Sequence, residues 1–247
     1  MKISTALKEG IALLRWSVGL LVMLENILGV KVVSKLRAIL LMEADFNATN
    51  KIVYGDRMLT NSRKYKLMPE EEFAEQNRIV DDDSLAKVVF YDIVRQLCIP
   101  AGIASVDAIN CYDSIVHVIA SLVFCSFDVA DMTVKAMLEA IEEMKFFLQT
   151  AYGDSNNSTT CTLQVRTQGL FQGNRVTPGG FLAISIVILC CRKRKGHRAM
   201  LIAPISRMRA KTAEIMFVKD NDLLHINMER DESIDKAFAS LQVSVGS

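Results

Sequence analysis

The sequence predicts an α+β fold, in which helices and strand-rich regions alternate along the chain. Stretches with apolar residues at three- and four-residue spacing predict amphipathic helices at 83–97 and 131–153. Runs rich in β-branched residues predict strands at 101–107 and 214–226. With 247 residues, of which 51% are apolar and 23% charged, the chain can bury a substantial core. We expect one compact body with two lobes.

The N-terminal third is predicted to be mostly helical. Residues 8–30 have apolar positions at mixed three- and four-residue steps, which predicts a helix ending near Gly29. Residues 33–43, "VSKLRAILLME", begin with a β-branched residue and are apolar later, so they fit a strand or a helix. Residues 45–65 mix turn formers with basic residues and predict a helix flanked by loops.

Residues 83–97 give the clearest helical pattern. Asp83 or Ser84 is the predicted N-cap, and Pro100 ends the helix. One face of this helix is predicted to be apolar and comprises Leu85, Val88, Val89, Ile93 and Leu97. The three aspartates at 81–83 could bind a metal, but adjacent carboxylates point in different directions and also favour a helix N-terminus.

The last third is predicted to hold a helix between two hairpins. Residues 154–169 are polar and then β-branched, which predicts a loop and a hairpin. Thr177 is the expected N-cap of the following helix, with Pro178 at its first position. The basic run at 192–198 is expected to be a solvated turn, although it could also bind a phosphate backbone or act as a nuclear address. Residues 213–228 predict a closing hairpin around "KDND".

Charge and cysteine content exclude several classes of function. The formal net charge of +1 gives no global attraction for nucleic acid, so any basic footprint must be local. The six cysteines form no CxxC pair, and the three histidines stand far from them, which excludes a zinc template. The N-terminus lacks the pattern of a signal peptide, so we expect an intracellular protein in the cytoplasm or nucleus, not a secreted one.

Two apolar runs raise the question of a membrane. Residues 16–33 are interrupted by Glu25 and Asn26, and residues 181–191 are too few for the roughly 20 residues that span a bilayer. Both runs are better explained as buried helices.

Three separated pieces of sequence carry the candidate chemistry. In "ASVDAINCYD", Asp107 ends an apolar strand and Tyr112 follows five residues later. In "QGNRVTP", Gln172 and Gly173 precede a helix, and in "FVKD" the last residue is Asp220. The order and spacing of these pieces resemble motifs A, B and C of reverse transcriptases, the RNA-directed DNA polymerases of retroelements.

The resemblance extends beyond the three motifs, from about residue 8 to about residue 230. Residues 35–58 resemble the fingers segment of non-LTR retroelement polymerases, although Ala38 stands where the family has proline. The resemblance implies one reverse transcriptase domain, with a mostly helical fingers-like region at 1–100 and a palm at 101–247. The implied palm is an antiparallel sheet backed by helices, and the implied thumb is incomplete, because only a short segment follows the "FVKD" hairpin.

The resemblance also implies residue roles in a two-metal nucleotidyl transfer with Mg²⁺. Two Mg²⁺ ions stabilise the attacking and leaving oxygens of phosphoryl transfer, and such hard cations bind carboxylates. The family's metal ligands correspond to Asp107, to Lys219 and, for the second hairpin aspartate, to Asp220. Lys219 places a positive charge where the family has an aspartate. Asp222 does not replace that aspartate, because alternation places it on the same face as Asp220.

Tyr112, Gln172 and Gly173 match positions that contact the incoming nucleotide and the template. Tyr112 corresponds to the aromatic residue that excludes a 2′-hydroxyl, and glycine at 173 permits close approach of the backbone. A half-buried tyrosine near a strand end, and an ordinary turn before a helix, are the simpler alternatives.

The predicted function is therefore that of a reverse transcriptase domain, a retrotransposon-derived pseudoenzyme whose polymerase activity is impaired or lost. Its implied partners are an RNA template, a DNA primer and deoxynucleotides, and no membrane. One alternative is a non-catalytic RNA-binding remnant that uses Arg37, Lys51, Arg57 and the 192–198 run. A second alternative is a membrane-associated helical protein built on residues 16–33 and 181–191.

Overall fold

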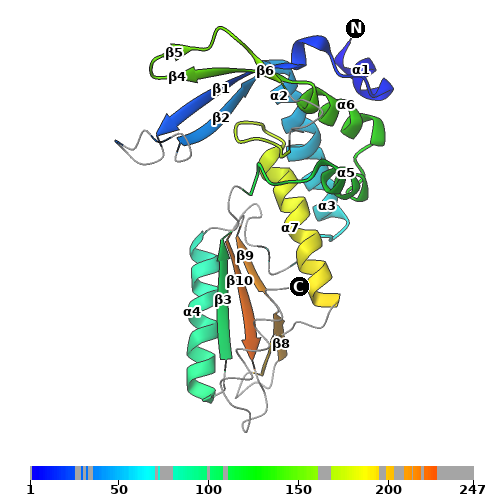
Figure 1. The fold of residues 1–247 in the computed structure, drawn as a ribbon. Helices are drawn as coiled ribbons and strands as arrows, with labels where there is room; N and C mark the ends of the chain where they lie inside the picture. The colour runs from blue at the N-terminus through cyan, green and yellow to red at the C-terminus, as the bar shows by residue number, and fades with distance from the viewer. Residues whose placement is uncertain are drawn as a thin grey trace. The chain divides into compact units, whose positions relative to one another are not determined.

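The computed structural model divides the chain into two compact units (Figure 1). Unit 1 comprises Met1–Tyr65 and Asn110–Ala183, and unit 2 comprises Lys66–Ile109 and Ile184–Ser247. The structure describes residues 2–25, 29, 32, 36–69, 72, 80–98, 101–107, 111–160, 168–194, 199–202, 209–212, 214–217 and 220–226.

Unit 1 combines one sheet with several helices. Its helices are α1 (Ile3–Glu9), α2 (Ala44–Asn50), α3 (Leu59–Lys64), α5 (His117–Ser126), α6 (Asp131–Glu142) and the first part of α7 (Thr177–Arg194), with a 3₁₀ helix, η1, at Leu14–Trp16. A π-helical segment, η3 (Lys51–Met58), joins α2 to α3, so residues 44–64 are helical as predicted.

The sheet of unit 1 has five strands. They are β1 (Val18–Glu25), β2 (Leu36–Met42), β4 (Lys145–Thr150), β5 (Gly153–Asp154) and β6 (Thr159–Thr160). The order is β2-β1-β4-β5, with β6 also paired to β4. β1 lies between an antiparallel partner, β2, and a parallel partner, β4.

The helix predicted for residues 8–30 is wrong, because Val18–Glu25 form the central strand β1. Val18, Leu20 and Val22 alternate with Gly19, Leu21 and Met23, so apolar residues occupy both faces of the strand. Such a continuous apolar run cannot be distinguished from a buried helix by periodicity alone. The ambiguous run at 33–43 contains a strand, β2.

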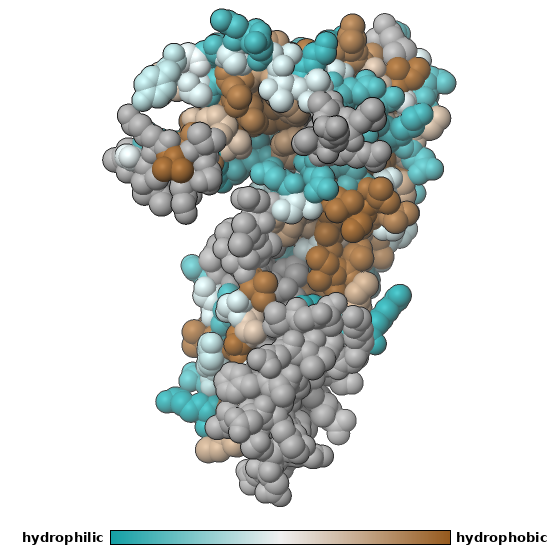
Figure 2. Space-filling view, viewed as in Figure 1, coloured by the Kyte–Doolittle hydropathy of each residue, from teal (hydrophilic) through white to brown (hydrophobic). Residues whose placement is uncertain are grey.

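Aromatic side chains hold the core of unit 1 together. Trp16 stacks on Phe46 with ring centroids 4.9 Å apart, and Tyr54 packs against Phe124 at 5.0 Å. All four side chains are at most 1% exposed. α5 also carries an apolar face that is open to solvent, on which Val118 and Leu122 are each 68% exposed, and Figure 2 shows brown, apolar atoms in this region.

Unit 2 contains a three-stranded antiparallel sheet backed by a helix. The sheet order is β3 (Ala101–Asp107), β10 (Asp220–Ile226) and β9 (Glu214–Phe217). Helix α4 (Val80–Leu97) contacts this sheet at β9, and Figure 1 shows the helix running alongside the sheet. A two-stranded pair, β7 (Ala199–Ile202) and β8 (Arg209–Thr212), completes the described strands. The predicted α+β class, with an antiparallel sheet backed by helices, is confirmed.

Helix α4 forms where the sequence predicts it, but two details differ. It begins at Val80, so Asp83 and Ser84 lie inside the helix and neither is its N-cap. The acidic residues instead occupy the first turns, where they complement the helix dipole. Of the apolar positions, Phe90 is 3% exposed, whereas Leu85 and Val88 are 61% and 55% exposed, so the buried face of α4 is centred on Phe90.

Helix α7 also differs in detail from its prediction. Thr177 is its first residue, and the Thr177 hydroxyl donates to the carbonyls of Leu170 and Phe171 instead of capping the helix. The helix continues to Arg194, so the first three residues of the 192–198 basic run are helical and the other four lie outside the described residues. Among the helices described, none is long and apolar enough to cross a membrane.

The compact units and the predicted functional regions divide the chain differently. Each unit draws on both predicted ranges, 1–100 and 101–247. The assignment of these ranges to fingers and palm therefore stays a prediction.

Candidate functional site

Two aspartate positions face each other on the sheet of unit 2. β10 pairs antiparallel with β3, and its register sets Asp220 opposite Asp107 and Asp222 opposite Ser105. Residues paired directly across antiparallel strands share one face, with Cβ atoms in general about 4.5 to 5.5 Å apart. The main chain thus brings Asp107 and Asp220 together across neighbouring strands, and alternation gives Asp222 the same face.

The hairpin that carries Asp220 is tighter than the sequence predicts. Phe217 pairs with Asp220, so only residues 218 and 219 connect β9 to β10. "KDND" is therefore not the turn, because its last three residues belong to β10. This strand has ladder partners on both sides, and such pairing overrides the low strand propensity of Asp and Asn. Lys219 lies outside the described residues.

Among the residues whose side chains the structure describes, no three His, Cys, Asp or Glu side chains gather as ligands. The side chains of Asp107 and Asp220 do not belong to that set. For these two residues the structure describes the pairing of the main chain.

The motif that contains Gln172 and Gly173 lies in unit 1, in a loop at residues 169–177 that we call the 169–177 loop. Gly169 has a φ of +88°, and a Cβ there would lie 2.4 Å from the Cα of Asp113. Gly173 has a φ of +107°, and a Cβ there would lie 2.2 Å from the carbonyl oxygen of Leu40. Ordinary contacts between heavy atoms are about 3.5 to 4.0 Å, so no side chain fits at either position.

Asparagines anchor the 169–177 loop to α2. The Asn47 side-chain amide donates to the carbonyl of Gly173 at 3.3 Å, and its oxygen accepts the N–H of Arg175 at 2.8 Å. One turn further on, the Asn50 amide donates to Oδ1 of Asn174 at 3.0 Å. Asn50 and Asn174 are each 2% exposed. Buried polar groups of this kind are costly unless they are paired, so these contacts define the path of the loop.

Gln172 is held through both its main chain and its side chain. Its carbonyl accepts the N–H of Leu40 at 2.7 Å, which adds the loop to the free edge of β2. Its side-chain oxygen accepts from Nε of Arg37, also at 2.7 Å. Loss of hydration raises the pKa of the Asp113 carboxyl, and the N–H that Gln172 donates to this group opposes the rise.

Tyr112 lies in the same unit as Gln172 and is linked to its loop. The Tyr112 carbonyl accepts the N–H of Leu170 at 2.9 Å. Its ring packs edge-on against Phe181 of α7, with centroids 5.7 Å apart and planes at 86°. Asp107 belongs to unit 2, so a common cleft for Tyr112 and Asp107 stays a prediction.

Positive charge gathers around the 169–177 loop. Arg37 contacts Gln172, and Arg175 is an exposed residue of the loop itself. Lys51 is exposed four residues after Asn47, which contacts the loop, and residues four apart share one side of a helix. Arg57 is exposed on η3, the segment that follows α2. Arg37, Lys51 and Arg175 form a local group of basic residues that the net charge of the chain does not reveal.

Two groups of residues at this loop carry no signal in the sequence. They are the asparagines Asn47, Asn50 and Asn174, and the histidine His117. His117, 8% exposed, contacts both Gly169 and Glu142. Apart from Val176, which lies two residues after Asn174, the side-chain hydrogen-bond partners of these residues are 25 to 128 positions away in the sequence, so no local pattern could have indicated them.

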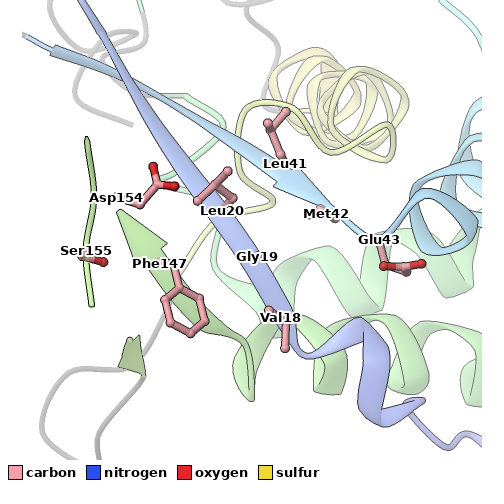
Figure 3. A pocket seen from close by; sticks show the side chains of 9 residues that line it. All are labelled: Val18, Gly19, Leu20, Leu41, Met42, Glu43, Phe147, Asp154 and Ser155. Carbon is pink, nitrogen blue, oxygen red and sulfur yellow. The ribbon is translucent and has the colours of Figure 1, made fainter. Parts of the chain in front are cut away.

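A separate hollow opens on the sheet of unit 1 (Figure 3). Its volume is about 470 Å³, and it is lined by Val18, Gly19, Leu20, Leu41, Met42, Glu43, Phe147, Asp154 and Ser155. None of the predicted site residues lines it. Its lining is mostly apolar, with two carboxylates at the margin, and nothing in it matches the chemistry of the motifs.

Comparisons with known proteins support the fold. No protein-family model matches the sequence, and no curated protein matches it. Solved telomerase structures are similar. Apo telomerase from Candida tropicalis, truncated from its C-terminal domain, has a TM-score of 0.52 and 11% identity, with 96% of this chain and 48% of that chain covered.

Two telomerases in complex with a TWJ fragment of telomeric RNA are similar as well. The Candida albicans structure has a TM-score of 0.56 and 10% identity, covering 94% of this chain and 40% of that chain. The Candida tropicalis structure has a TM-score of 0.53 and 11% identity, covering 96% of this chain and 39% of that chain. Telomerase is a reverse transcriptase, so this chain has a reverse-transcriptase-like fold and spans less than half the length of these structures.

Proposed function

We propose that this chain is a reverse transcriptase domain of retroelement type that binds RNA but has lost efficient DNA synthesis. The observation that carries the proposal is the ladder register that sets Asp220 opposite Asp107. In a reverse-transcriptase-like fold, that pair on neighbouring strands matches the carboxylates of motifs A and C. The motif spacing in the sequence and the similarity to telomerase structures give independent support.

The donor set does not fit the two Mg²⁺ ions that the family uses. Asp107 and Asp220 offer hard oxygen ligands, but the third matching position is Lys219. At a separation of 4 Å and an effective dielectric of 20, an ammonium and a divalent ion repel by about 8 kcal/mol. An aspartate there would attract the ion instead. The lysine therefore disfavours a bound metal at this position.

RNA binding is the part of the ancestral function that the described residues support. The telomerases of Candida albicans and Candida tropicalis were solved with a fragment of telomeric RNA. In this chain, Arg37, Lys51 and Arg175 surround the 169–177 loop, and such residues neutralise phosphates. Arg37 and Gln172 are hydrogen-bonded to each other, which places one charge beside the predicted nucleotide contact.

Primer extension tests the catalytic part of the proposal. On an RNA template, the native chain is expected to incorporate no deoxynucleotides, whereas Lys219→Asp restores Asp107-dependent synthesis and Lys219→Asp with Asp107→Ala abolishes it. Binding of Mg²⁺ or Mn²⁺ is measured on the same variants, because restored metal binding supports the account even if extension is weak. Robust Asp107-dependent synthesis by the native chain would show that Lys219 does not impair the site.

RNA affinity tests the non-catalytic part. The logarithm of the affinity for a single-stranded RNA oligonucleotide is expected to fall linearly with that of the salt concentration. Arg37→Ala should reduce the slope by about 1, because one phosphate contact is lost. Arg95→Ala, which removes an exposed arginine of α4 in unit 2, is the matched control. Affinity that is independent of salt would exclude this mode of binding.

A further inference from the structure

His117 is the first residue of α5 and connects three parts of unit 1. Its Nε2 lies 2.8 Å from the carbonyl oxygen of Gly169, the first residue of the 169–177 loop. Its Nδ1 lies 2.8 Å from a carboxylate oxygen of Glu142, the last residue of α6. The histidine side chain is 9% exposed and that of Glu142 is 54% exposed. The ring is therefore almost buried between two oxygen atoms.

The two contacts set a requirement on the protons of the ring. A backbone carbonyl and a carboxylate can only accept hydrogen bonds, so each ring nitrogen must donate to make both bonds. A neutral imidazole carries one proton, and it would leave one nitrogen facing an acceptor at 2.8 Å. Both bonds therefore exist together when the ring is an imidazolium and Glu142 is a carboxylate.

The other contacts of Gly169 show what this arrangement holds in place. The Gly169 N–H donates to the carbonyl of Ile115, and the next N–H of the loop donates to the carbonyl of Tyr112. His117 satisfies the one remaining polar group of Gly169, its carbonyl. The start of the loop is thus fixed to the segment from Tyr112 to His117 by three bonds, of which only the His117 bond depends on a titratable group.

We propose that His117 is a positioning residue which, as an imidazolium, ties the start of the 169–177 loop to the end of α6. The loop carries Gln172 three residues further on, so the tie sets where the predicted nucleotide contact lies. This consequence for nucleotide binding rests on the proposed function, whereas the tie itself does not. Loss of the proton loosens the loop, which makes its order depend on pH.

The charged groups around His117 come from each element packed against it. On α6, Glu142 contacts the ring, and Glu139 precedes it by one turn. Beside the loop, Asp113 packs its main chain against Gly169 and accepts the N–H of Gln172. α5 itself carries no Asp, Glu, Lys or Arg. The test must therefore separate the effect of His117 from those of Glu142 and Asp113.

The unmodified protein allows the tie to be tested without a mutation. Nitrogen-15 NMR of the imidazole, recorded at pH 5.5 and at pH 8, counts the protons on the two nitrogens of His117, and the tie requires two protons wherever both hydrogen bonds are present. Where one of these protons is lost, the amides of Gly169 and Leu170 should lose roughly ten- to a hundredfold in protection against exchange, expressed as protection factors to remove the intrinsic effect of pH, as expected for a hydrogen bond to a charged group. Equal protection at both pH values would overturn the proposal.

Three variants assign the effect to its residues. His117→Gln keeps one neutral donor for Gly169, so protection should be low and the same at both pH values. Glu142→Gln offers an amide donor to a neutral ring, so the tie should persist at pH 8 and the pH dependence disappear. His225→Gln, which removes a histidine from β10 in unit 2, should leave the pH dependence unchanged. A pH-dependent loss that survives in His117→Gln would contradict the assignment.

A binding measurement separates the tie from the proposed function. The dissociation constant for a deoxynucleoside triphosphate should rise between pH 5.5 and pH 8 in the unmodified protein and stay constant in Glu142→Gln. If protection changes with pH but the nucleotide binds at neither pH, the tie is correct and the predicted contact of Gln172 with a nucleotide fails, whereas the proposed RNA binding is judged by its own salt dependence. If the nucleotide binds equally at both pH values while protection changes, His117 does not position Gln172 for this ligand.

Discussion

The 169–177 loop in unit 1 and the β3–β10 ladder in unit 2 carry different motifs, and they are held in place by different means. Side chains add to three main-chain hydrogen bonds in holding the loop, since Asn47, Asn50 and Arg37 all bond to it from elements more than 120 positions away. Main-chain pairing holds the ladder, in which Asp107 and Asp220 occupy directly opposed positions. The identity of a loop residue therefore matters for folding, whereas a carboxylate contributes nothing to ladder pairing.

This difference decides how much each motif says about function. Glycine at 173 and asparagine at 174 are sufficiently explained by the close approach to Leu40 and by burial. Directly opposed like charges destabilise a pair of strands, so folding gives no reason for Asp107 and Asp220. The ladder pair is therefore the stronger functional evidence, although the loop match covers more residues. Four substitutions can break or sharpen this comparison.

The largest expected effect is that of Gly173→Ala. A Cβ at this position would lie 2.2 Å from the Leu40 carbonyl oxygen, and the residue would also need a φ of +107°. We expect the free energy of unfolding to fall by about 3 kcal/mol, from backbone displacement added to the strain of a positive φ. Urea denaturation measures this change in the free energy of unfolding.

Gly153→Ala is the matched control for that substitution. Gly153 has a φ of +121°, but a Cβ there would have no heavy atom within 4 Å. The substitution should lower the free energy of unfolding by about 1 to 2 kcal/mol, which is the strain of the backbone conformation alone. Equal losses for the two variants would mean that the contact with Leu40 does not constrain the loop.

Asn174→Ala should have the second largest effect. Its side-chain oxygen accepts from the Asn50 amide at 3.0 Å and from the Val176 N–H at 3.1 Å, in a site that is 2% exposed. Removal leaves two buried donors without their acceptor, so we expect a loss of about 2 kcal/mol in the free energy of unfolding. Asn47→Ala, at a half-buried position, should lower the free energy of unfolding by less. The reverse order would show that the loop is anchored through Asn47.

The sequence predicted the ladder better than it predicted the loop, because the resemblance to motifs A and C already implied that Asp107 and Asp220 lie on neighbouring strands. The local pattern alone placed the turn at "KDND", whereas the pairing of Phe217 with Asp220 leaves residues 218 and 219 as the connection. The anchors of the loop are single hydrogen bonds between distant residues, such as Asn50 and Asn174, which leave no periodic pattern. Motif matching could locate Gln172 and Gly173 but not what holds them.

The error at residues 8–30 has a related cause. β1 is paired on both sides and apolar on both faces, so its sequence lacks the alternation that marks a strand with one solvent face. β1 is a strand because it pairs with β2 and β4. Both partners lie outside the short stretch of sequence from which its periodicity is read. Periodicity located α4 and α6, but the helix predicted at 131–153 is wrong beyond Glu142, because Lys145–Thr150 form β4, and Leu85 and Val88 of the predicted apolar face of α4 are exposed.

Asp107→Asn tests whether the ladder pair opposes folding. In the presence of a chelator, the substitution should raise the free energy of unfolding by about 0.5 kcal/mol, because it removes repulsion between opposed carboxylates. Asp222→Asn is the control, since the residue opposite Asp222 is the uncharged Ser105. A loss of stability for Asp107→Asn alone would show that Asp107 is neutralised by a partner in the folded protein, and Lys219→Gln would then identify that partner.

Asp113→Asn should have the smallest effect, with a sign that depends on pH. Loss of hydration raises the pKa of this carboxyl above its ordinary value of 3.8, more than the N–H of Gln172 lowers it. The folded protein then binds the proton more tightly than the unfolded chain does, so the free energy of unfolding falls as pH rises from 3.8 through the raised pKa. Asparagine can still accept the Gln172 N–H and carries no charge to desolvate. The variant should therefore be more stable than the native chain at pH 7, and the difference should vanish below pH 3.8.

Asp56→Asn, at an exposed position of η3, controls for the loss of one charge in urea denaturation at both pH values. A less stable Asp113→Asn at pH 7 would mean that the charged hydrogen bond to Gln172 outweighs the lost hydration, and that the loop, like the ladder, depends on a carboxylate.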